Sequence, residues 1–132
     1  PESYKIAFAA LDAVWEDNRT DSLAILLGGM AINRNDEVSM DPGALSDWEQ
    51  ITSRAEDASV LDLILAYLDL DASRYRNVPD DLRGLINALR TEGSREREIV
   101  DSVIATWQKD PESWPLYAEL TWQQPQSDEQ GG

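Results

Sequence analysis

Apolar residues recur at helical spacing along almost the whole of this chain. In the first segment the large apolar side chains stand at positions i, i+4, i+7 and i+11: Tyr4, Phe8, Leu11 and Trp15. That spacing places them on one face of an α-helix. A strand is conceivable only at residues 115–122, because no other run alternates between apolar and polar residues. The sequence therefore predicts an all-α fold, a compact bundle of six to seven short helices.

Capping residues predict where these helices begin. Side chains of Ser, Thr, Asp and Asn accept hydrogen bonds from the free N–H groups of a first helical turn, and proline fits the first helical position. Helix starts are expected at the following places: Ser3, Thr20 or Asp21, Asp41-Pro42, Asp57 or Ser59, residues 77–81, Ser94, and Asp110-Pro111.

Glycines and the density of apolar residues predict helix ends and the centre of the bundle. Gly28 and Gly29 each cost roughly 1 kcal/mol inside a helix relative to alanine, so the second helix is expected to end at Gly28. Gly93 is expected to terminate the fifth helix. Residues 60–68 are apolar except for Asp62. We therefore expect this fourth helix to lie in the middle of the fold, because helices that are apolar all round are usually buried.

The length of 132 residues fits one domain. We expect residues 1–122 to form a single helical domain. Residues 123–132 are rich in Gln, Pro, Ser, Asp, Glu and Gly, and are expected to form a disordered acidic tail. Three tryptophans at helical positions are expected in the core: Trp15, Trp48 and Trp107.

The chain lacks histidine and cysteine and has a formal net charge of −15. It therefore has neither the commonest catalytic base nor a thiol nucleophile, and no disulfide is possible. We expect no cofactor. A charge of this sign repels nucleic acid and anionic membranes and attracts basic proteins. No secretory signal or long apolar span is evident, so a cytoplasmic location is expected.

The acidic residues are concentrated in one stretch that contains no base. We predict that these five acids bind a basic protein partner: Asp36, Glu37, Asp41, Asp47 and Glu49. Trp114 precedes Pro115, and Trp122 stands three residues before Pro125. Tryptophans often anchor protein interfaces. Trp114 and Trp122 are candidates for the same interface, or alternatively they cap one end of the bundle.

A second hypothesis is that the protein is an enzyme. Glu98 and Asp101 stand three residues apart and share a helix face. Helical nucleotide pyrophosphatases of the MazG type bind magnesium with such a pair and a Glu-x-x-Glu pair on a neighbouring helix. The second pair is missing here. The alternatives to a binding protein are therefore a magnesium-dependent nucleotide hydrolase and a structural partner within a larger complex.

Six arginines follow one another between residues 74 and 97: Arg74, Arg76, Arg83, Arg90, Arg95 and Arg97. They are able to bind a phosphate or an acidic peptide. The interpretation we favour is that they neutralise acids of the first half of the chain across helix contacts, where exposed pairs contribute about 0–1 kcal/mol each.

Residues 35–48 carry a resemblance to a known group of proteins. A short acidic turn is followed by Asp41-Pro42 and, five residues after the proline, by Asp47-Trp48. This arrangement resembles that of many small acidic bacterial proteins, several of them immunity proteins encoded beside secreted toxins. Glu37 stands where those proteins usually have glycine. The resemblance implies an acidic helical protein that occludes a basic toxin, often a nuclease, by binding it.

Overall fold

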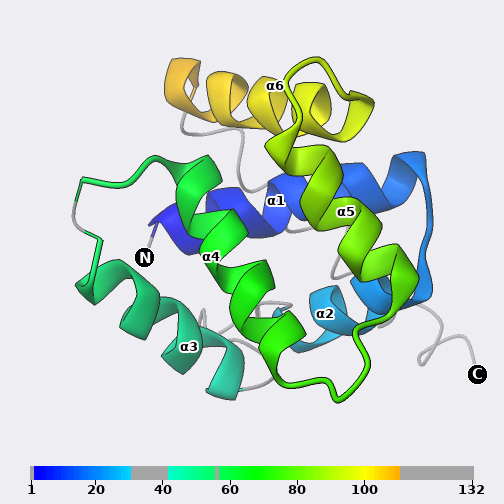
Figure 1. Ribbon diagram of the computed structural model, residues 1–132. Helices are drawn as coiled ribbons and strands as arrows, with labels where there is room; N and C mark the ends of the chain where they lie inside the picture. The colour runs from blue at the N-terminus through cyan, green and yellow to red at the C-terminus, as the bar shows by residue number, and fades with distance from the viewer. Residues whose placement is uncertain (1, 31–41, 56, 111–132) are drawn as a thin grey trace, which may run out of the picture.

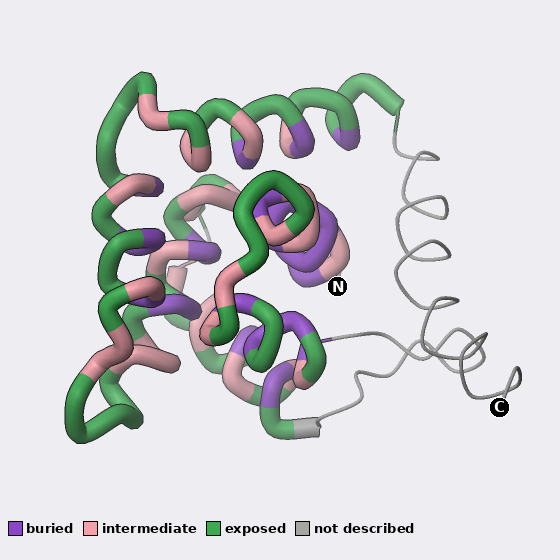
Figure 2. Tube along the Cα trace, turned by 90° about the vertical axis from the view of Figure 1, so that its right-hand side faces the viewer, coloured by how far each residue is buried: buried purple, intermediate pink, exposed green. Residues whose placement is uncertain are grey.

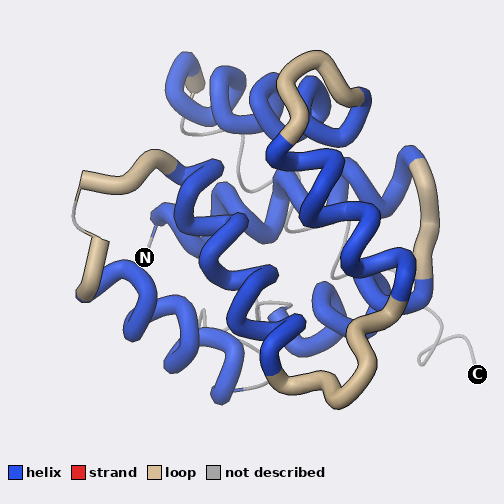
Figure 3. The backbone as a smooth tube through the Cα atoms, in the orientation of Figure 1, coloured by secondary structure: helices blue, strands red, loops and turns tan. Residues whose placement is uncertain are grey.

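The computed structural model describes residues 2–30, 42–55 and 57–110. This part of the chain contains six helices: α1 (Glu2–Asp17), α2 (Asp21–Met30), α3 (Pro42–Ser53), α4 (Val60–Ser73), α5 (Asp80–Arg90) and α6 (Arg95–Lys109) (Figure 1). Loops connect them, and the described residues include no strand (Figure 3). The all-α prediction is confirmed. The expected helix after Asp110, the possible strand at residues 115–122 and the tail at residues 123–132 lie outside the described residues.

Helix α1 passes through the centre of the bundle. It lies behind α4 and α5 in Figure 1, with α6 above it and α2 below it. Residues 6–11 are all buried, and since they span more than one turn, this middle part of α1 is covered on every side. Buried residues face the middle of the bundle and exposed residues its outside (Figure 2). The expectation that the fourth helix is central was therefore wrong.

The size of the apolar side chains explains this correction. Helix α4 has more large apolar residues, but Leu61 and Leu65 are only half-buried, and Asp62 is exposed. In α1, Ala9 and Ala10 are fully covered. Small side chains allow neighbouring helices to approach closely from several directions, so an alanine-rich helix fits a position that a leucine-rich helix does not.

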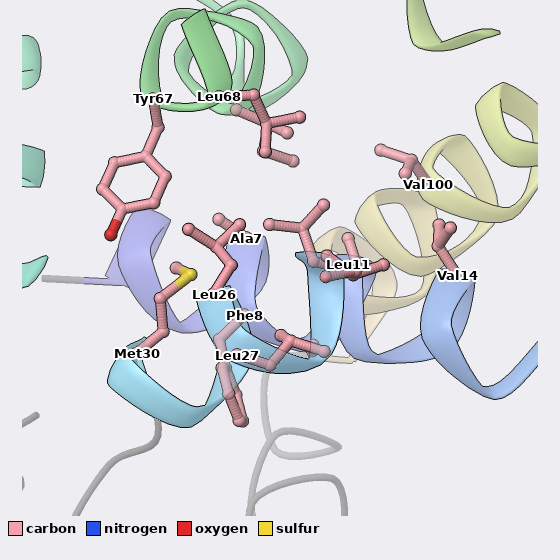
Figure 4. Packing of buried hydrophobic residues seen from close by; sticks show 14 of the residues in the cluster. Ala7, Phe8, Leu11, Val14, Leu26, Leu27, Met30, Tyr67, Leu68 and Val100 are labelled. Carbon is pink, nitrogen blue, oxygen red and sulfur yellow. The ribbon is translucent and has the colours of Figure 1, made fainter. Parts of the chain in front are cut away.

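The core is built by helices that are distant in sequence. Figure 4 shows side chains of α1, α2, α4 and α6 that meet in one cluster. The labelled members come from these four helices: Ala7, Phe8, Leu11, Val14, Leu26, Leu27, Met30, Tyr67, Leu68 and Val100. None of the described helices combines the length and the hydropathy that a membrane crossing requires.

Helix α2 continues beyond the end predicted for it. It runs through Gly28 and Gly29 to Met30, and no atom lies within 4 Å of the position that a Cβ of Gly28 would take. The side chain of Met30 is completely buried, and the Tyr4 hydroxyl donates a hydrogen bond of 2.7 Å to the Met30 carbonyl oxygen. Burial of a methionine contributes about 1.5–3 kcal/mol, which offsets the cost of the two glycines.

Most of the predicted helix boundaries are confirmed. The hydroxyl of Ser59 accepts a hydrogen bond from the N–H of Asp62 at the start of α4, and the hydroxyl of Ser94 does the same for Arg97 at the start of α6. Gly93 does not terminate α5 as expected: the helix ends at Arg90 with Thr91 as its C-cap, and Gly93, with a φ of 84°, lies in the turn that follows. The prediction that Ser3 caps the first helix was wrong, because α1 already begins at Glu2 and Ser3 lies within it.

Candidate functional site

Two of the predicted partner-binding residues, Asp47 and Glu49, lie on α3. The other five lie outside the described residues: Asp36, Glu37, Asp41, Trp114 and Trp122. The described part of the candidate interface is therefore α3 and the helices on which it packs.

Trp48 fixes the position of α3. Its side chain has no exposed surface, and its Nε1–H donates a hydrogen bond of 3.0 Å to the Ser3 hydroxyl of α1. Its ring lies 5.9 Å from the ring of Tyr4 and 5.6 Å from that of Tyr67, measured between centroids, at angles of 63° and 59°. These tilted arrangements are favourable for aromatic pairs. Trp48 thus joins α3 to both α1 and α4.

Asp47 holds α3 against the end of α4. Arg74 Nη1 donates to Asp47 Oδ2 at 2.6 Å, and Arg74 Nη2 donates to Asp47 Oδ1 at 2.8 Å. The Asp47 side chain is only 17% exposed, compared with 55% for Arg74. The hydrogen bond with Asp47 raises the pKa of Arg74. Both oxygens of this carboxylate are therefore engaged within the fold.

Asp71 lies near this ion pair, and its carboxylate accepts no hydrogen bond from a described residue. Burial raises the pKa of Asp71; Arg74 opposes the increase and the charge of Asp47 adds to it. Burial is also the main cause that raises the pKa of Tyr67; Tyr4, Asp47 and Asp71 add to the increase, and Arg74 opposes it. The junction of α3 and α4 therefore concentrates negative charge around one arginine.

Glu49 differs from Asp47, which forms an ion pair with Arg74. It is exposed on the outer side of α3 and makes no ion pair with a described residue. Five further exposed acids in the described part of the chain share this property: Asp21, Asp57, Asp62, Glu92 and Glu98.

Most arginines in the described part of the chain form ion pairs with aspartate or glutamate side chains. Arg74 pairs with Asp47, and Arg95 donates to the Asp17 carboxylate at 2.6–2.9 Å, which joins α6 to α1. For these two arginines, of the six named from the sequence, the prediction that they neutralise acids of the first half across helix contacts is confirmed. Arg90 pairs with Asp69 of α4. The remaining three ion pairs are local, within three or four residues: Glu16 with Arg19, Asp80 with Arg83, and Asp101 with Arg97. The unpaired surface charge is thus predominantly negative.

Glu98 and Asp101 do not form part of a larger acidic cluster. Both are exposed on α6, and Asp101 Oδ2 lies 3.4 Å from Arg97 Nε. In the described ranges, no three His, Cys, Asp or Glu side chains are close enough to hold a metal ion together. Arg95, three residues before Glu98, pairs with Asp17. The described residues supply no further ligand for the pair that the hydrolase alternative requires.

Asp81 has a role that its position at a helix start did not reveal. Its Oδ1 accepts a hydrogen bond of 2.6 Å from the Ser22 hydroxyl, and its Oδ2 accepts one of 3.1 Å from the Ser22 N–H. These hydrogen bonds lower the pKa of Asp81. The carboxylate therefore caps the first turn of α2 from a position 59 residues away. No local sequence pattern identifies such a contact.

Asp71→Asn and Asp81→Asn are expected to change stability in opposite directions at pH 7. The folded-state pKa of Asp71 is raised above 3.8, so ionisation opposes folding and the amide should raise Tm. The folded-state pKa of Asp81 is lowered below 3.8, so its ionised carboxylate stabilises the fold. This stabilisation is present above pH 3.8 and is lost as the pH falls through the folded-state pKa. The Asp81 variant should therefore lower Tm by a few degrees.

Thermal unfolding followed by circular dichroism at pH 7 and pH 3 tests both substitutions. Each difference from the unmodified chain should shrink at pH 3, where the carboxyl groups are largely protonated in the unfolded state. If both substitutions changed Tm in the same direction at pH 7, the opposite effects assigned to the Asp71 and Asp81 carboxylates on stability would be contradicted.

Comparison of this chain with protein-family models, with curated proteins and with solved structures gave no match.

Proposed function

We propose that this protein is a non-enzymatic acidic binding protein that neutralises or inhibits a basic protein partner. The observation that carries the proposal is the net charge of −15, together with the ion pairs that the arginines form with acids of the same chain. Six arginines each have an acidic partner in the described part of the chain. The excess acids are consequently left on the surface, where they are available to a cationic protein.

Electrostatic complementarity explains why such a surface suits an inhibitor. Opposite charge on two proteins increases the rate of encounter, and salt weakens this effect. Nuclease active sites are positively charged because they bind phosphate. The resemblance of residues 35–48 to immunity proteins favours a toxin of that class as the partner.

Asp47 and Glu49 have different roles in this proposal. Asp47 is held by Arg74, so we assign it to positioning α3, while its residual exposed edge faces the partner. Glu49 is exposed and makes no ion pair with a described residue, so we assign it to direct contact. Asp36, Glu37 and Asp41 supply further negative charge, and Trp114 and Trp122 supply apolar anchors.

The experiment begins with the immobilised full chain. Proteins retained from a lysate at low salt and released at high salt are identified, and the most enriched basic protein is purified. Its association rate with the chain is then measured by stopped flow. We expect the rate to fall about tenfold or more as salt is raised from low to physiological concentration, and the partner's own activity to be inhibited stoichiometrically.

Two charge-matched variants locate the interface. Glu49→Gln and Glu98→Gln each remove one exposed negative charge that has no ion pair in the described part of the chain, from α3 and from α6 respectively. Glu49→Gln should slow association by about twofold or more, since interface charges act mainly on the association rate, while Glu98→Gln should leave it unchanged. Equal effects would contradict the assignment to α3. Magnesium-dependent nucleotide hydrolysis by the purified chain, lost in Glu98→Ala, would contradict the proposed function.

A further inference from the structure

A groove of about 400 Å³ lies where α4 leads into α5. In Figure 1 these two helices run side by side, and Figure 3 shows the loop that joins them. Three arginines line the groove, Arg76 from the loop and Arg83 and Arg90 from α5. Such a concentration of guanidinium groups is unexpected on a protein with a net charge of −15.

The arginines of the groove have hydrogen-bond donors to spare. Arg90 Nη2 donates to Asp69 Oδ2 at 2.6 Å, and Arg83 Nη2 donates to Asp80. Arg76 is exposed and makes no ion pair with a described residue. A guanidinium group carries five N–H donors, so most donors here are unused. Three arginines against two carboxylates leave one positive charge in excess.

The overall negative charge does not prevent an anion from binding here. The Debye length is about 8 Å at physiological ionic strength, so acids farther away across the surface are largely screened. The charges that line the groove therefore determine the local potential, and their sum is positive.

The groove also has an apolar side and neutral polar groups. Ala72 and Val78 are half-buried in its wall, and the amide groups of Asn77 and Asn87 are exposed along it. Pockets for small molecules usually have volumes of about 300–1,000 Å³ and combine apolar walls with a few polar groups. The volume of this groove falls within that range.

We propose that this groove binds a small organic phosphate monoester. The phosphate group lies among Arg76, Arg83 and Arg90, and the organic part lies on Ala72 and Val78. A phosphate dianion presents three acceptor oxygens, which matches several guanidinium forks better than a single carboxylate does. This site is separate from α3 and does not depend on the proposed binding of a basic protein.

Phenyl phosphate and inorganic phosphate are the probes for this site. Each is titrated into the full chain at constant ionic strength, and the amide resonances of Asn77, Val78 and Asn87 are followed by NMR. We expect saturable shifts in the millimolar range or below, with tighter binding of phenyl phosphate because its ring contacts the apolar wall.

Arg76→Gln and Arg54→Gln form a matched pair. Both arginines are exposed and make no ion pair with a described residue, but only Arg76 lines the groove. Arg76→Gln should weaken phenyl phosphate binding about tenfold or more, the loss expected for charge-assisted hydrogen bonds, and Arg54→Gln should leave it unchanged. Absence of saturation, equal loss in the two variants, or equal affinity for both probes would overturn the proposal.

Discussion

Replacing Trp48 by alanine is expected to lower the free energy of unfolding by about 3–5 kcal/mol, the usual cost of removing a large buried aromatic side chain. The indole is fully buried, packs against Tyr4 and Tyr67, and donates a hydrogen bond to Ser3. The substitution therefore leaves a cavity and an unpaired hydroxyl at the junction of α1, α3 and α4. Urea denaturation followed by circular dichroism measures the loss.

Trp15→Ala is the matched control for this substitution. Trp15 is only half-buried, and the guanidinium carbon of Arg19 lies 4.6 Å above its ring. We expect this variant to lose about 1–2 kcal/mol, because less apolar surface is buried there. Equal losses for the two tryptophans would contradict the role of Trp48 as the anchor of α3.

Leu11→Ala is expected to be the second most damaging change, with a loss of about 2–5 kcal/mol. Leu11 is fully buried in α1, the helix that is covered on every side, and it lies in the cluster shown in Figure 4. Little of the cavity can be filled by relaxation, because helices pack on α1 from several directions. The same denaturation measurement applies.

Leu61→Ala in α4 distinguishes the two candidates for the central helix. Leu61 is half-buried, so its truncation should cost about 1 kcal/mol or less. A larger loss for Leu61→Ala than for Leu11→Ala would mean that α4, and not α1, is the centre of the bundle.

Local patterns in the sequence predicted much of the described fold. Ser59 and Ser94 cap helices as expected because the groups that they satisfy lie three residues away. The prediction for Gly93 was less accurate: Thr91 caps α5, and Gly93 uses its positive φ in the turn that follows. The periodicity of residues 80–90 also identified the buried face of α5, which is Leu82, Leu85, Ile86 and Leu89.

The candidate site was less predictable. The sequence indicated that the arginines neutralise acids, but not that Arg74 engages Asp47 while Glu49 remains free. The two residues of the ion pair are 27 positions apart, and their contact depends on how Trp48 places α3 against α4. The groove at Arg76 was equally unpredictable from the sequence, because its arginines belong to a loop and a helix, and the relative placement of these two segments sets the distances between the arginines.

The sequence by itself determined that the chain is helical and where most helices begin, because hydrogen bonds within one or two turns decide both. It also determined the surplus of acidic charge. Only the tertiary structure decided that α1 is central, that α2 continues to Met30, and which acids are paired. Burial and ion pairing depend on which helices pack together, and that choice is made by the shape and size of side chains that are distant in sequence.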